Sequence, residues 1–90
     1  MTMRRYERAM KQNMASAEKD YKEDPEHRRG YVIGAIQKLW EVYQGKQING
    51  AQFDQLIAML SEFSKGEYRA FIAELVRDYK SGNPPTIVGY

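Results

Sequence analysis

The chain divides into two parts that differ sharply in apolar content. Every Val, Ile, Leu, Phe and Trp lies at or after Val32, and the segment before it has only Met, Tyr and Ala as apolar side chains. Aliphatic and aromatic side chains form most of a protein core. The first part must therefore pack onto a core that the second part builds, pack onto another molecule, or stay mobile.

The length of 90 residues allows a single domain with a small core. No Cys is present, so neither a disulfide nor a thiolate metal site can add stability, and oligomerisation or a partner surface is the remaining source. No apolar stretch has the length of a signal peptide or a membrane span. We expect a cytoplasmic protein without a membrane partner.

The net charge of +2 is too small to indicate a polyanionic partner, but the charges are unevenly placed. Residues 4–11 are mainly basic, and residues 18–26 are mainly acidic. Any electrostatic recognition is therefore expected in the N-terminal segment.

Apolar residues recur every three or four positions along this segment, which predicts an amphipathic helix over about residues 2–22. The members of this Met/Tyr face are Met3, Tyr6, Met10, Met14, Ala17 and Tyr21. The order of charges, with cations first and anions last, is the reverse of what the helix dipole favours. A contact with another surface is one reason for such an order.

A second helix is predicted to begin at Asp24-Pro25-Glu26, because Asp caps a helix and Pro fits its first turn. Gly45 is expected to end it. Gly34 lies inside this helix at a cost of up to about 1 kcal/mol, and we expect the close approach of a neighbouring helix to compensate.

Two more helices follow. Asn49-Gly50 is a turn or an N-cap before a helix that reaches Phe63. Ser64 and Glu67 have the spacing of a capping box, which predicts that the last helix begins there and ends near Lys80. The prolines of the tail exclude a helix and predict an extended segment.

The predicted fold is all-α: a small bundle of three core helices, with an additional polar amphipathic N-terminal helix and an extended C-terminal tail. The corresponding ranges are 1–24 for the N-terminal arm, 25–81 for the compact core and 82–90 for the tail. The predicted core residues are Ile36, Leu39, Trp40, Phe53, Leu56, Leu60, Phe71, Leu75 and Val76.

Several classes of chemistry have no support in the sequence. The lone His27 lacks a third metal ligand beside Glu23 and Asp24, and no nucleophile and base can be paired. The segment around Ile48 fails the ligand pattern of a calcium loop. The last helix carries balanced charges that do not suit a DNA-recognition helix. We predict no enzymatic activity, cofactor, metal site or small-molecule ligand.

The predicted function is a non-enzymatic protein–protein interaction module, such as an adaptor, inhibitor or assembly factor, that self-associates or binds a protein partner. Met and Tyr suit adaptable contact surfaces, and cations steer the approach of a partner. The predicted partner-binding residues are Tyr6, Met10, Met14 and Tyr21, with Arg4, Arg5 and Arg8. The Met/Tyr face could instead cover the chain's own bundle.

The alternative function is nucleic-acid binding through the basic N-terminal arm. Arg4, Arg5, Arg8 and Lys11 are interleaved with Tyr6, a pattern that can serve phosphates and bases. Four cations without a supporting basic fold favour this alternative less than protein binding.

Overall fold

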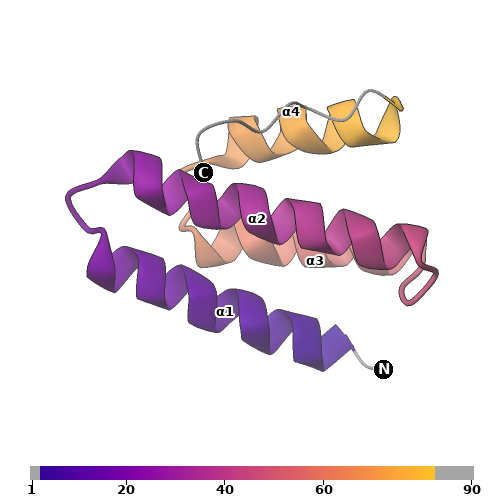
Figure 1. Ribbon diagram of the computed structural model, residues 1–90, viewed down its shortest axis with the longest axis horizontal. Helices are drawn as coiled ribbons and strands as arrows, with labels where there is room; N and C mark the ends of the chain where they lie inside the picture. The colour runs from indigo at the N-terminus through magenta and orange to yellow at the C-terminus, as the bar shows by residue number, and fades with distance from the viewer. Residues whose placement is uncertain (1–2, 83–90) are drawn as a thin grey trace.

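The computed structural model describes residues 3–82, which form four α-helices and no strand (Figure 1). The helices are α1 (Met3–Asp20), α2 (Pro25–Gln44), α3 (Gly50–Phe63) and α4 (Arg69–Lys80). The all-α prediction is confirmed for this range. The predicted extended tail lies outside the described residues.

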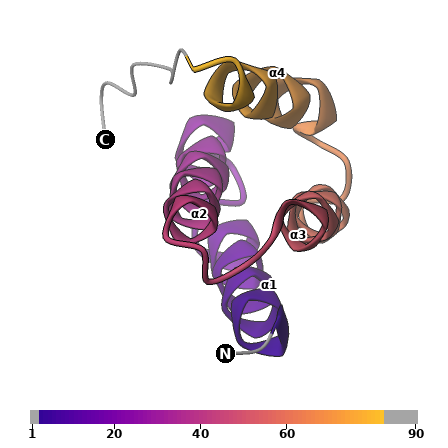
Figure 2. The ribbon, with the colours of Figure 1, turned by 90° about the vertical axis from the view of Figure 1, so that its right-hand side faces the viewer.

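The helices are arranged around the pair α2 and α3. α1 and α4 each pack on both members of this pair, from opposite sides (Figure 2). α1 and α2 run antiparallel, so that the start of α1 lies near the end of α2 (Figure 1). Within residues 3–82, no helix has the length and apolar content needed to cross a bilayer.

One hydrophobic core joins all four helices. α1 contributes Met10 and Met14 to it, so part of the predicted Met/Tyr face covers the chain's own bundle. The buried residues of this core are Met10, Met14, Val32, Ile36, Leu39, Val42, Ile48, Phe53, Leu56, Leu60, Ile72, Leu75 and Tyr79.

Three of the predicted core residues are less buried than expected. Trp40, Phe71 and Val76 pack against the core but stay partly exposed. Each lies at the edge of its helix's apolar face, next to a buried position that points more directly inward. Helical spacing alone does not distinguish the centre of such a face from its edge.

The limits of α2 and the start of α3 follow from local chemistry. Asp24 caps α2 by accepting from the backbone N–H of His27, Pro25 fills the first turn, and Gly45 is the C-cap, as predicted. Asn49 and Gln52 form a reciprocal capping box at the start of α3, with distances of 2.8 and 2.9 Å.

The capping box predicted at Ser64 and Glu67 is wrong. Lys65 and Gly66 adopt positive φ angles of 59° and 71°, respectively, and this left-handed turn ends α3. The Ser64 hydroxyl donates to the Ser61 carbonyl instead of capping, and α4 begins only at Arg69. The Glu67 carboxylate binds Arg28.

The compensation predicted for Gly34 is also wrong. Within the described range, a Cβ placed on Gly34 would have no heavy atom within 4 Å, so none of the other three helices approaches it closely. Gly34 instead faces open space beside α1.

Truncating a buried methionine of α1 should destabilise the whole fold. We expect Met14→Ala to lower the free energy of unfolding by about 2 kcal/mol or more, because it leaves a cavity between α1 and the core. Urea unfolding followed by circular dichroism measures this. Gln12→Ala, at an exposed position of the same helix, should change it by less than about 0.5 kcal/mol. Equal effects would contradict the docking of α1.

Mutants distinguish the capping box observed at Asn49 from the one that the sequence predicts at Ser64. Asn49→Ala should lower the free energy of unfolding by about 1 kcal/mol because it removes an N-cap acceptor. Ser64→Ala should cost clearly less, since its hydroxyl only bonds within the last turn of α3. Urea unfolding of both variants checks this; a larger cost at Ser64 would support the sequence prediction instead.

Candidate functional site

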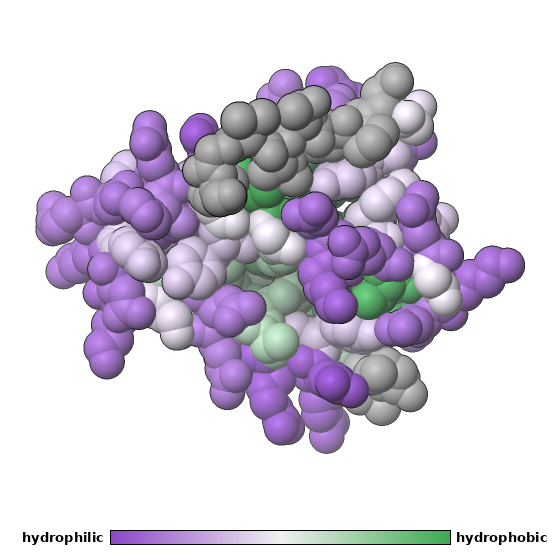
Figure 3. All heavy atoms as spheres, in the orientation of Figure 1, coloured by the Kyte–Doolittle hydropathy of each residue, from purple (hydrophilic) through white to green (hydrophobic). Residues whose placement is uncertain are grey.

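A groove of about 500 Å³ runs along the seam between α1 and α2. In the space-filling view, apolar and weakly polar surface gathers in the middle of this face, with hydrophilic side chains around it (Figure 3). The groove is lined by Tyr6, Ala9, Met10, Asn13, Tyr21, His27, Gly30, Tyr31, Gly34, Ala35, Lys38 and Leu39. Aromatic residues stand toward its two ends, and its middle is built from small ones.

At one end of the groove, Tyr6 ties the start of α1 to the connection between α2 and α3. Its hydroxyl donates to the Gln47 side-chain oxygen at 2.8 Å, while its ring is partly exposed. This bond fixes the position of the Tyr6 ring at the end of the groove.

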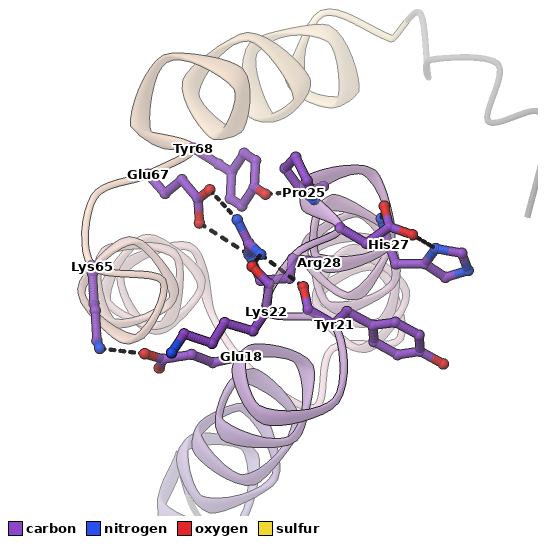
Figure 4. A network of polar contacts seen from close by, with 10 residues as sticks. Glu18, Tyr21, Lys22, Pro25, His27, Arg28, Lys65, Glu67 and Tyr68 are labelled. Carbon is purple, nitrogen blue, oxygen red and sulfur yellow. Dashed lines mark hydrogen bonds and ion pairs between the residues drawn. The ribbon is translucent and has the colours of Figure 1, made fainter.

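At the other end, three rings come together from the end of α1 and the start of α2. Tyr21 stacks on His27 with ring centroids 4.6 Å apart and planes 9° from parallel (Figure 4). The ring centroid of Tyr31 lies 6.0 Å from that of Tyr21. Tyr31 is half-buried and His27 is exposed. The cluster forms an aromatic wall with polar edges, a surface suited to protein contact.

Asp24 orients the histidine of this wall. Its carboxylate lies 2.5 Å from His27 Nδ1 and also accepts from the His27 backbone N–H. The side-chain hydrogen bond from His27 is the main cause that lowers the pKa of Asp24 below its ordinary value. The ionised Asp24 therefore fixes the His27 ring and caps α2 at the same time.

The structure separates the predicted partner-binding residues into three groups. Met10 and Met14 are 4 % and 5 % exposed, so the folded chain offers them little contact with a partner. Tyr6 and Tyr21 are half-buried and line the groove. Arg4, Arg5 and Arg8 are exposed on α1, and among the described residues none of the three lines the groove.

Sequence reasoning missed the α2 side of the groove. Tyr31, Gly34 and Lys38 lie there at intervals of three and four, together with His27. That spacing marks one face of α2, which is more polar and more exposed than the buried face through Ile36. These residues are small, polar or aromatic, so they do not form the aliphatic stripe that predicts a buried helix face.

A second hollow, of about 360 Å³, lies between the end of α1, the first half of α2 and the connection between α3 and α4. Arg28 dominates it: the guanidinium bonds to Glu67 at 2.6 Å and donates to the carbonyls of Tyr21 and Lys22 at 2.7 and 2.5 Å (Figure 4). The Tyr68 hydroxyl adds a bond to the Pro25 carbonyl at 2.7 Å. Arg28 thus joins the connection after α1 to the connection before α4.

Four of the five charged side chains that line this second hollow are paired with one another, and Lys22 is the fifth. Lys65 binds Glu18 at 2.5 Å, and the bond from Arg28 lowers the pKa of Glu67. Burial is the main cause that raises the pKa of Tyr68. Because these two ion pairs occupy most of its charged groups, this hollow is better explained as a joint that holds the helix ends than as a ligand site.

The groove is lined by few titratable side chains. Within residues 3–82, no three His, Asp or Glu side chains converge as metal ligands would. Its titratable side chains are tyrosines, His27 and Lys38, and the histidine is engaged by Asp24.

The comparisons with known proteins add no assignment to this description. No protein-family model, curated protein or solved structure matches the chain. The geometry of the groove is therefore the basis on which a function can be inferred.

Replacing Asp24 by Asn should weaken the dependence of stability on pH. Asn keeps an N-cap oxygen but carries no charge for His27. A carboxyl whose pKa is lowered by folding stabilises the fold above its unfolded pKa, near 3.8, and this contribution is lost as the pH falls through its folded pKa.

We therefore expect the loss of unfolding free energy between pH 5 and pH 3 to be smaller in Asp24→Asn than in the unmodified chain. Urea unfolding at the two pH values measures it. Glu74→Gln, at an exposed carboxylate of α4 outside the groove, serves as the control and should leave the loss unchanged. An undiminished loss in Asp24→Asn would contradict the Asp24–His27 contact.

Proposed function

We propose that the protein is a non-enzymatic protein–protein interaction module that binds its partner along the groove between α1 and α2. The observation that carries this proposal is the construction of the groove: partly exposed tyrosines toward its ends and small residues between them. Such a surface provides apolar contact area and polar edges at little cost in side-chain entropy. A volume of about 500 Å³ accommodates side chains that project from a partner.

The position of the contact differs from the one that the sequence indicates. Since Met10 and Met14 are in the core, a partner meets the α2-facing flank of α1 and not the centre of its Met/Tyr face. Tyr6 and Tyr21 remain part of the proposed surface, joined by Tyr31 of α2. The exposed Arg4 and Arg8 lie outside the groove, where cations influence the rate of encounter more than affinity.

A cytoplasmic location stays a prediction.

Nucleic-acid binding through Arg4, Arg5 and Arg8 is the alternative function to test. Mobility of labelled DNA and RNA at two salt concentrations separates nucleic-acid binding from protein binding. We expect no shift at low salt. A shift that weakens steeply with salt and disappears when the three arginines are replaced by Ala would favour the alternative.

Blocking the groove should abolish capture of the partner. The full chain, immobilised, is compared with Ala9→Lys, which places a long cation in the groove, and with Ala73→Lys, which makes the same change on the exposed side of α4. Both substitutions suit a helix, so the fold is retained. We expect proteins of the source cell that bind the unmodified chain to be lost with Ala9→Lys and kept with Ala73→Lys.

One outcome would contradict the proposed binding surface. If the two lysine variants retain the same proteins as the unmodified chain, the groove is not the binding surface. Circular dichroism of each variant confirms that the helices are intact before the comparison is made.

A further inference from the structure

A cation lines the groove toward one end, and an anion lies beside its other end without lining it. Lys38 lines the groove at the end marked by Tyr6 and Leu39. Asp20 is the last residue of α1, two turns beyond Asn13 on the same face, and therefore lies at the Tyr21 end. Both charged side chains are exposed, and within the part of the chain that the structure describes neither has an ion-pair partner.

The antiparallel arrangement of α1 and α2 makes this separation of charge a property of the whole face (Figure 1). The first turn of α1 contains no acidic residue, although the helix dipole favours one there. Near the end of α1, Glu18 forms an ion pair with Lys65 of the same chain. That pair gives no reason for the second anion there, Asp20. A surface with a basic end and an acidic end is complementary to itself when turned by 180°.

We propose that the occupant of the groove is a second copy of this chain, related to the first by a two-fold axis across the middle of the groove. The two grooves then run antiparallel, so that Lys38 of each copy faces Asp20 of the other. This inference rests on the proposed function, and it specifies the partner. Each ion pair occurs twice, as the symmetry of an isologous dimer requires.

The middle of the groove suits the position of such an axis. Ala9, Asn13 and Gly34 lie there, between the aromatic ends. Among residues 3–82, no heavy atom comes within 4 Å of a Cβ placed on Gly34, and glycine is a poor helix former. Close approach of a second helix backbone at this point gives the glycine a physical reason.

The size of the chain supplies an independent argument. A domain of 90 residues buries a modest fraction of its surface, and α1 adds little aliphatic area to the core. A second copy on the outer flank of α1 buries the remaining tyrosine rings and holds α1 in place. Oligomerisation is a common way for so small a domain to gain stability.

Charge reversal tests this geometry directly. Sedimentation of the purified full chain over a range of concentrations should show a dimer. Lys38→Glu alone and Asp20→Lys alone each bring like charges together at both contacts, and each should weaken dimerisation about tenfold at low salt. Lys11→Glu and Glu74→Lys, exposed charges outside the groove, are the matched controls and should leave it unchanged.

Rescue distinguishes the proposed symmetry from general charge effects. An equimolar mixture of the Lys38→Glu and Asp20→Lys chains restores attraction at both contacts, so we expect mixed dimers of near-normal affinity. The double variant should recover for the same reason. Gly34→Lys should weaken the dimer without lowering the stability of the single chain, because the added side chain meets nothing in that chain.

A chain that sediments as a monomer at every concentration would overturn the inference, and so would charge reversals without rescue on mixing. The proposed function fails separately. If the purified chain is a monomer while Ala9→Lys still abolishes capture of another protein, the groove binds a different partner. If Ala9→Lys changes neither capture nor dimerisation, both proposals are wrong.

Discussion

The docking of α1 through a few soft side chains is the contact on which the rest of the structure depends. Met10, Met14 and Ala17 are the buried residues of this helix, and none of them is branched or aromatic. Methionine adapts its shape to the space that the other helices leave, so α1 can cover α2 and α3 without closely fitted packing. The groove exists because α1 covers only part of α2 and leaves the flank with Gly34 open.

Polar contacts at both ends compensate for the softness of this docking. At the start of α1, the Tyr6 hydroxyl donates to Gln47. Just after the end of α1, the Arg28 guanidinium donates to the carbonyls of Tyr21 and Lys22. Arg28 also binds Glu67, so one side chain, 17 % exposed, links the α1–α2 connection to the α3–α4 connection at one end of the bundle. Because the ends are fixed, the aromatic wall at Tyr21 and His27 keeps its place beside α2.

Local signals predicted the fold better than the site. Asp24-Pro25, Gly45 and Asn49 mark helix limits through chemistry within a few residues, and the structure confirms each of them. Ser64 and Glu67 misled because their spacing is local, whereas the bond that binds Glu67 comes from Arg28, 39 residues away. The periodicity of α1 correctly indicated an amphipathic helix. It could not say which part of the Met/Tyr face α2 and α3 cover, since that depends on long-range packing.

The central claim is that the flank between α1 and α2 is a contact surface while α1 stays docked on its own core. Amide ¹H–¹⁵N spectra of the full chain across a dilution series test it residue by residue. The account predicts that signals of Ala9, Asn13, Tyr31 and Gly34 shift with concentration, while those on the exposed side of α4, such as Ala73, stay fixed. Spectra that do not change with concentration, or changes centred on α4, would contradict it.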